Sequence, residues 1–172
     1  MKIAVVTDST AYLTKEEYAE YGIYVLPMSV IFGQETYREE IDITAEEFYA
    51  KVKSSPVFPT STQPAVGETY ELFHELAKDY DAIIPITISS GISGTYQTCV
   101  AVAEDLKDEV AIYPIDSEIS CAPQARAVKL AAIMAKSGEY SPEEIVETVQ
   151  RLVDRTTAYF IVDDLSNLQR GG

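Results

Sequence analysis

The feature that most constrains the fold is a near-continuous apolar run from Asp81 to Ile88, D-A-I-I-P-I-T-I. A strand of this composition is buried on both faces, as in a parallel sheet covered by helices on each side. Further strand-like runs at 2–7, 24–32, 110–115 and 158–162 alternate with helical patterns. The helical patterns cover residues 15–21, 42–53, 66–78, 94–107, 120–137 and 141–155. This alternation predicts an α/β protein, a three-layer α/β/α sandwich around a parallel sheet.

Charge and hydropathy exclude several classes of partner. The formal net charge is −15, so nucleic acid and anionic lipid surfaces would repel the chain. No apolar run is long enough to span a bilayer, which predicts no stable membrane insertion. The opening residues, M-K-I-A-V-V-T-D, indicate a first strand and not a signal peptide. We therefore expect a cytoplasmic protein.

The sequence offers little for a metal ion. Its two cysteines, Cys99 and Cys121, have no C-x-x-C spacing, and its only histidine is His74. Zinc sites need several such ligands close together, so we expect no metal. We expect both cysteines to be small buried hydrophobic residues and His74 to be a partly exposed surface residue.

Two hydroxyl-rich loops are the strongest candidates for a binding site. The first is P-T-S-T-Q-P at 59–64 and the second is S-S-G-I-S-G-T-Y-Q at 89–97, each before a helical pattern. Hydroxyl groups and free backbone N–H groups at a helix start can hold an anion without lysine or arginine. Gly94 would let a backbone N–H approach the anion closely. Taken singly, Ser93 or Thr95 is better explained as a helix N-cap, whereas the two loops together favour a site.

The predicted topology brings further polar residues to the same place. Asp8, Ser9 and Thr10 follow the strand at 2–7, and Asp116-Ser117 follows the strand at 110–115. Ligands of open parallel sheets sit beyond the carboxyl ends of the strands, where these loops and the 89–97 loop would meet. Asp8, Ser9 and Thr10 have two open interpretations: contact with the ligand, or support of a loop beneath it.

These motifs, in this order, resemble the bacterial DegV family. The family pattern has a V-T-D-S-T opening, a T-S-Q-P loop, an S-S-x-L-S-G-T-Y-Q loop, an I-D-S turn and a closing segment that ends in G-G-R. The chain has counterparts at 6–10, 60–64, 89–97, 115–117 and 159–172. The hydroxyl types at Ser61 and Thr62 are swapped relative to the commonest form.

The resemblance implies a non-enzymatic carrier with no catalytic residue and no cofactor. It would hold a long-chain fatty acid and present the carboxylate to a separate fatty acid kinase, which makes the acyl phosphate for phospholipid synthesis. The implied carboxylate ligands are Ser61, Ser93, Thr62 and Gly94. Residues implied to support them are Asp8, Ser9, Thr10, Thr95, Gln97 and Ser117. The acyl tail would need an apolar tunnel; the stretch 26–32 is a possible wall, although we expect most of it to be core.

The resemblance also implies a domain division. Family members are longer, with a Rossmann-like first domain and a smaller second α/β domain, the ligand lying between them. This chain ends at Gly172, inside the last motif. We therefore expect residues 1–157 to form the first domain and 158–172 to begin a second domain that is largely missing.

Other functions fit the residues less well. A serine hydrolase would need G-x-S-x-G around Ser93 and a nearby base, and neither is evident. A phosphate- or flavin-mononucleotide-binding, flavodoxin-like protein remains the alternative, because a hydroxyl loop before a helix suits phosphate too. The Walker A and G-x-G-x-x-G motifs are absent from the sequence. A purely structural interaction module also remains open.

Overall fold

A parallel sheet forms the centre of the molecule. The computed structural model describes residues 1–159 and 161. Strand order is β2-β1-β6-β7, with β8 also paired to β6, and every pairing is parallel. The strands are β1 (Ile3–Asp8), β2 (Ile23–Leu26), β6 (Ala82–Thr87), β7 (Ala111–Ile112) and β8 (Ile115–Asp116). Both β1 and β6 are buried along their whole length, which confirms the interpretation of the 81–88 run.

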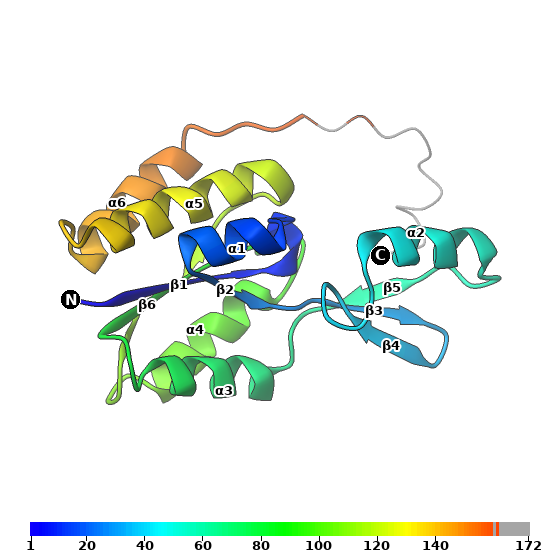
Figure 1. Ribbon diagram of the computed structural model, residues 1–172, viewed down its shortest axis with the longest axis horizontal. Coiled ribbons are helices and arrows are strands. Elements are labelled where there is room, and N and C mark those ends of the chain that lie inside the picture. Colours follow the sequence, from blue (N-terminus) through cyan, green and yellow to red (C-terminus); the bar gives the residue numbers. More distant parts are fainter. Residues whose placement is uncertain (160, 162–172) are drawn as a thin grey trace.

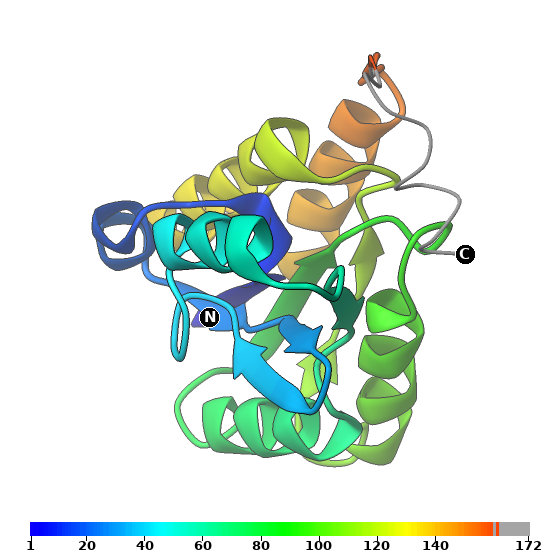
Figure 2. The same ribbon diagram turned by 90° about the vertical axis from the view of Figure 1, so that its right-hand side faces the viewer.

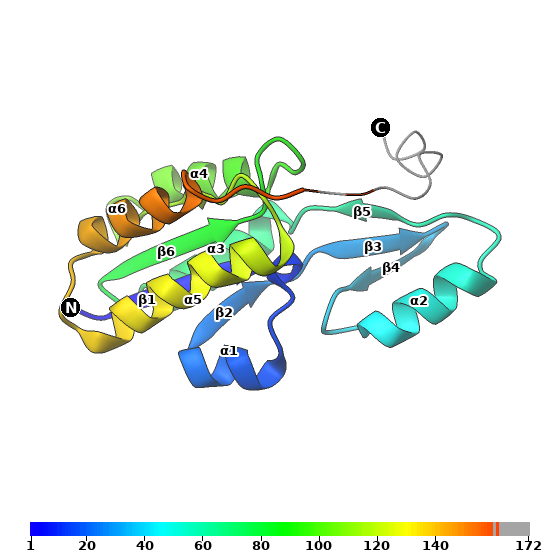
Figure 3. The ribbon, with the colours of Figure 1, turned by 90° about the horizontal axis from the view of Figure 1, so that it is seen from above.

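Helices cover both faces of this sheet (Figures 1 and 3). Because side chains alternate along a strand, Ile3 and Val5 pack on one face, and Ala4 and Val6 on the other. The first face is covered by α1 (Lys15–Tyr21), α5 (Cys121–Ser137) and α6 (Pro142–Val153). The second is covered by α3 (Val66–Leu76) and α4 (Thr95–Asp105). The predicted three-layer α/β/α sandwich is confirmed.

Side chains fix where several helices begin. Thr14, Thr44 and Ser141 each accept a hydrogen bond from the backbone N–H three residues later. The glutamate at that later position bonds back to the N-cap amide, which completes a capping box. These reciprocal bonds satisfy amides that have no partner inside the helix.

The strand predicted over 24–32 is wrong in extent, because the chain changes sheet in its middle. Strand β2 ends at Leu26 and β3 (Ser29–Phe32) starts a second sheet, with Pro27 and Met28 between them. Proline has no N–H to donate, and the Met28 amide bonds the Ser9 hydroxyl at 2.9 Å instead of a strand. Strand β2 thus ends because Pro27 has no amide hydrogen and the Met28 amide is bonded to a side chain.

The second sheet and one helix form a small lobe, defined here as residues 29–62. Strand β3 pairs antiparallel with β4 (Glu35–Arg38) and with β5 (Thr60–Thr62). Helix α2 (Ala45–Ser54) lies over this sheet (Figure 2). The lobe projects from one end of the parallel sheet (Figure 1). It has its own hydrophobic cluster, made of Val30, Phe32, Ile43, Tyr37, Phe48 and Val52.

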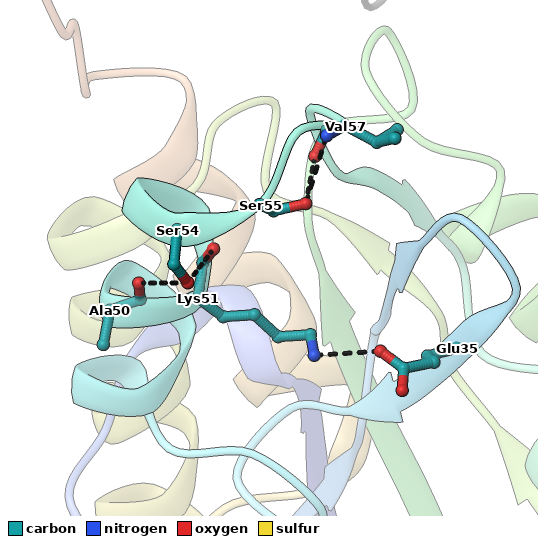
Figure 4. A network of polar contacts seen from close by, with 6 residues as sticks. All are labelled: Glu35, Ala50, Lys51, Ser54, Ser55 and Val57. Atoms are coloured by element: carbon teal, nitrogen blue, oxygen red, sulfur yellow. Dashed lines mark hydrogen bonds and ion pairs between the residues drawn. The ribbon is translucent and has the colours of Figure 1, made fainter.

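Lys51 ties α2 to the edge of the lobe's sheet (Figure 4). Its Nζ lies 2.9 Å from Glu35 Oε2 and 5.4 and 5.1 Å from the ring centroids of Phe32 and Tyr37. The Ser55 hydroxyl then donates to the Val57 carbonyl at 2.8 Å and accepts from the Val57 amide. These bonds turn the chain out of α2 and toward β5.

Two further expectations concern segment ends. Helix α3 ends at Leu76, two residues before the predicted end at 78. The strand expected at 158–162 lies partly outside the described residues, and Ala158, Tyr159 and Ile161 are not in a strand. The domain boundary after residue 157 remains a prediction. Among the described residues, no helix combines the length and the apolar character needed to cross a bilayer.

Candidate functional site

The carboxyl ends of β1, β6 and β8 meet at one edge of the parallel sheet. The Ile88 amide donates to Asp8 Oδ2 at 2.6 Å, which joins the ends of β1 and β6. The Ser117 amide donates to the Thr87 carbonyl at 3.1 Å, which joins the ends of β8 and β6. The predicted convergence of these polar loops is therefore confirmed.

Asp8 supports this edge from below. Its side chain is fully buried, and Oδ1 accepts from the Thr10 amide at 3.0 Å and from the Thr10 hydroxyl at 2.5 Å. Gln124 of α5, also fully buried, donates to the same oxygen at 3.2 Å and to the Thr7 hydroxyl at 3.1 Å. Of the two interpretations of Asp8 and Thr10, the contacts favour support of the loop.

Ser9 connects the parallel sheet to the small lobe. Its hydroxyl donates to Glu39 Oε2 at 2.6 Å and accepts from the Met28 amide at 2.9 Å. Burial raises the pKa of Glu39 above its ordinary value, and the Ser9 hydrogen bond offsets part of that rise. Glu39 was not anticipated from the sequence, where it is one of many acidic residues.

Ser93 and Thr95 lie at the N-terminus of α4. The Ser93 and Thr95 hydroxyls are 2.9 Å apart, and the Thr95 amide donates to Ser93 Oγ at 3.3 Å. The Thr95 hydroxyl is buried and points at Met28 Sδ, 3.6 Å away. The Thr98 amide donates to the Gly94 carbonyl at 3.0 Å, which closes the first turn of α4. The backbone amides before Thr98 have no carbonyl partner inside the helix. This turn has the positive end of the helix dipole, which suits an anion.

The two hydroxyl-rich loops touch each other through Gln63. Its Nε2 donates to the Thr98 hydroxyl of α4 at 2.8 Å. Its side-chain amide lies so close to Gly94 that a Cβ there would be 2.1 Å from Gln63 Oε1. Ser61 is two residues before Gln63 and Ser93 is next to Gly94, so the contact joins the two segments that contain the candidate serines.

Ser61 and Thr62 lie on opposite faces of the small lobe's sheet. Ser61 is opposite Val30, and directly paired residues share a face, here the face beneath α2. Thr62 is opposite Ser29, and these two line a separate polar hollow on the other face. The expectation that both hydroxyls face the same anion conflicts with this alternation of side chains along β5.

A pocket opens beside Ser61, between α2 and the small sheet. Its volume is about 230 Å³. The lining is mostly aromatic and aliphatic; its other residues are Thr44, Thr60, Ser61, Glu39 and Glu40, and it includes no lysine or arginine. The apolar lining residues are Tyr12, Val30, Ile43, Ala45, Phe48, Tyr49, Phe58 and Pro59. These residues are far apart in the sequence and come together only when the lobe folds, so the sequence alone does not indicate a pocket.

The remaining predicted site residues are separate from this pocket. Ser117 is buried and donates to the Ile119 carbonyl at 3.0 Å, which shapes the turn after β8. Gln97 is exposed on α4. His74, on α3, is 2.8 Å from Glu109 and partly exposed, as predicted. Cys99 is buried, but the expectation for Cys121 is wrong, because Cys121 is exposed at the start of α5.

The described residues contain no cluster of three or more histidine, cysteine, aspartate or glutamate side chains arranged to hold a metal ion. This end of the molecule has neutral donors at the two hydroxyl-rich loops and an apolar pocket beside the first of them. Together they suit a molecule with an anionic head and an apolar body.

Known proteins match this chain over its whole length. DegV of Bacillus subtilis (strain 168) is 48% identical over 172 residues, which is 100% of this chain and 61% of that protein. The crystal structure of B. subtilis DegV, described as a fatty acid binding protein, superposes with a TM-score of 0.96 at 47% identity and covers the same shares. A DegV family protein from Thermus thermophilus, whose structure is described as showing fatty acid binding, gives a TM-score of 0.90 at 27% identity. That match covers 99% of this chain and 60% of the other.

The chain thus spans about three fifths of the length of these relatives. The model of the DegV family, described as uncharacterised proteins, matches residues 2–172. By this match and by its identity to the relatives, the chain belongs to the DegV family.

Proposed function

We propose that this chain is the part of a fatty acid carrier that holds the acid by its carboxylate and encloses part of its tail. The observation that carries the proposal is the apolar pocket that opens beside Ser61 of the first hydroxyl-rich loop, which Gln63 joins to α4. The family relatives described as fatty acid binding proteins support it. The carrier needs no cofactor, and the fatty acid is its only ligand.

The carboxylate would bind at the hydroxyl loops. Ser61 and Ser93 supply O–H donors and the first turn of α4, beginning at Gly94, supplies N–H donors. A hydrogen bond to a charged group contributes about 1.5–3 kcal/mol, so two or three can hold a carboxylate without a cation. Thr62 faces away from Ser61, so we expect its side chain to contribute less than Ser61 does.

The acyl tail would enter the pocket in the small lobe. Glu39 and Glu40 line that pocket, and their negative charge disfavours a carboxylate inside it. The charges therefore orient the acid with its head at the loops and its tail against Val30, Phe48 and Phe58. The 230 Å³ of the pocket is below the roughly 300–1,000 Å³ of typical ligand sites, so this chain alone would enclose only part of the tail.

We further propose a cytoplasmic carrier that presents the carboxylate to a separate fatty acid kinase. Hydroxyl and amide groups bind a carboxylate but do not phosphorylate it, so another protein has to supply that chemistry. The single histidine, His74 on α3, lies 2.8 Å from Glu109 and does not line the pocket. A carrier of this kind contributes binding and orientation, not catalysis.

The experiment uses the complete protein with its natural C-terminal part. Native and denaturing mass spectrometry of the purified protein should find one long-chain fatty acid per chain. Replacing both serines, Ser61→Ala with Ser93→Ala, should lower the affinity for a fluorescent fatty acid by at least about a hundredfold, from the loss of two charge-assisted bonds. Ser90→Ala is the matched control, because Ser90 is exposed in the same loop and bonds Asp116 through its backbone amide.

The outcomes separate the candidates. Unchanged affinity in the double variant would contradict the assignment of the carboxylate site. A bound flavin or phosphate compound instead of a fatty acid would favour the flavodoxin-like alternative. For the kinase step, acyl phosphate should form from fatty acid and ATP only when carrier and kinase are mixed, and formation by the kinase alone would contradict the presenting role.

A further inference from the structure

Gln63 is held at both ends of its amide group. On one side, Nε2 donates to the Thr98 hydroxyl at 2.8 Å. On the other, the amide lies against the backbone of Gly94, where a Cβ would be 2.1 Å from Oε1, 3.0 Å from Cδ and 3.3 Å from Nε2. The side chain therefore spans the gap between the end of β5 and the start of α4.

A larger residue at position 94 would meet the Gln63 side chain and not an unfavourable backbone conformation. Gly94 has φ −79°, which any residue can adopt. An alanine there would have to displace the Gln63 amide, because real Cβ contacts are longer than 3.0 Å. Moving the amide would break its bond to Thr98, whose side chain is nearly buried at 6% exposure. The buried hydroxyl would then lose its partner.

This contact joins the segments that contain the two candidate serines. Ser61 belongs to the small lobe and Ser93 to the loop that follows the parallel sheet. Gln63 is the side chain that bonds one loop to the helix of the other. We infer that Gln63 is a positioning residue: its amide, seated on Gly94 and bonded to Thr98, sets the distance between the two hydroxyl loops. The consequence for fatty acid affinity rests on the proposed function.

A pair of substitutions at Gln63 and Gly94 tests whether Gln63 acts as a spacer between the two hydroxyl loops. In the complete protein, Gly94→Ala should weaken fatty acid binding by about tenfold, because the new methyl group forces the Gln63 amide off Thr98 and the displaced side chain then pushes the two loops apart. Gln63→Ala alone should weaken binding by about threefold, since the loops keep their other contacts. With both substitutions the affinity should match Gln63→Ala alone, because the added methyl then has room.

Gly91→Ala is the matched control within the same loop. A Cβ at Gly91 would be 3.5 Å from Ser89 Oγ, an ordinary contact distance. The control should leave affinity and melting temperature unchanged. A loss equal to that of Gly94→Ala would mean that the loop tolerates no alanine at all, which would overturn the specific role of Gln63.

Melting temperature gives a readout that needs no ligand. Gly94→Ala should lower it by a few degrees in the natural background and by clearly less in the Gln63→Ala background. Equal losses in both backgrounds, in stability or in affinity, would overturn the spacer. If the natural protein binds no fatty acid, the proposed function fails, and the melting temperatures still decide whether Gln63 and Gly94 are coupled.

Discussion

Replacing Asp8 by asparagine should destabilise the protein severely, although Asp8 touches no part of the pocket. Its carboxylate is fully buried and accepts four hydrogen bonds, from the Thr10 amide and hydroxyl, the Ile88 amide and Gln124 Nε2. All four donors point at the two oxygens. An asparagine of the same shape places an NH₂ group against one set of them.

The loss of stability can be worked out from the oxygen that accepts fewer hydrogen bonds, Asp8 Oδ2. If the asparagine oxygen keeps the position of Oδ1, the Ile88 amide loses its 2.6 Å bond and faces another donor. Loss of a bond to a charged group and one unpaired buried donor together cost about 3 kcal/mol. For a chain of this size, that corresponds to a drop in melting temperature of about 6–12 °C.

Urea unfolding at pH 7, followed by circular dichroism, measures this loss. Asp81→Asn is the matched control, because Asp81 is exposed and its side chain accepts a single bond, from the Lys2 amide at 2.7 Å. An asparagine can still accept that bond, so the control should change the free energy of unfolding by less than about 0.5 kcal/mol. A loss below about 1 kcal/mol for Asp8→Asn would refute the role of Asp8 as the brace between β1 and β6.

Three further predictions concern charge, backbone and thiols. Burial raises the folded-state pKa of Glu39, so its contribution to stability is present below the unfolded pKa of about 4.5 and is lost as the pH rises through the folded value. Glu39→Gln should therefore gain stability over the natural protein between pH 4.5 and 7, and identical pH profiles in urea unfolding would contradict this. Gly67→Ala, in α3 with nothing within 4 Å of the added methyl, should stabilise by about 0.5–1 kcal/mol, whereas Gly22→Ala, at φ +68°, should destabilise by about 1 kcal/mol in the same assay. Burial raises the pKa of Cys99 to about 12, whereas Cys121 is exposed. A thiol reagent at pH 8 should therefore modify Cys121 alone in the folded protein and both cysteines in urea. Two rapidly modified thiols in the native state would refute the burial of Cys99.

The central sheet and its helices were predictable because their signals are local. Strand β6 has an unbroken apolar run, and the capping boxes at Thr44 and Ser141 mark helix starts within four residues. The convergence of the polar loops also followed, since parallel strands end at the same edge. These inferences need only the order of the elements.

The small lobe was not predictable, because β4 and β5 are strands only by virtue of their pairing with β3. Strand β5 is T-S-T, fully exposed and without apolar alternation, and β4 is mostly polar. Both are held by β3, which the sequence merges with β2 into one apolar stretch. The pocket and the opposite orientations of Ser61 and Thr62 follow from that pairing, so they could not be seen beforehand.

The contacts that assemble the candidate site are long-range for the same reason. Glu39 meets Ser9 thirty residues away, and Gln63 meets Thr98 thirty-five residues away. Neither pair forms a motif along the chain. Composition shows only that acids and hydroxyls are plentiful, not which of them are buried together.

The separate hydrophobic cluster of the small lobe has a consequence for how related proteins diverge. Val30, Phe32 and Ile43 belong to a cluster that shares no residue with those beneath the helices of the parallel sheet. Substitutions within this cluster reshape the pocket while leaving the packing of the main sheet as it is. Related proteins can therefore differ in the shape of this pocket while they keep the same packing in the main sheet and the same brace at Asp8.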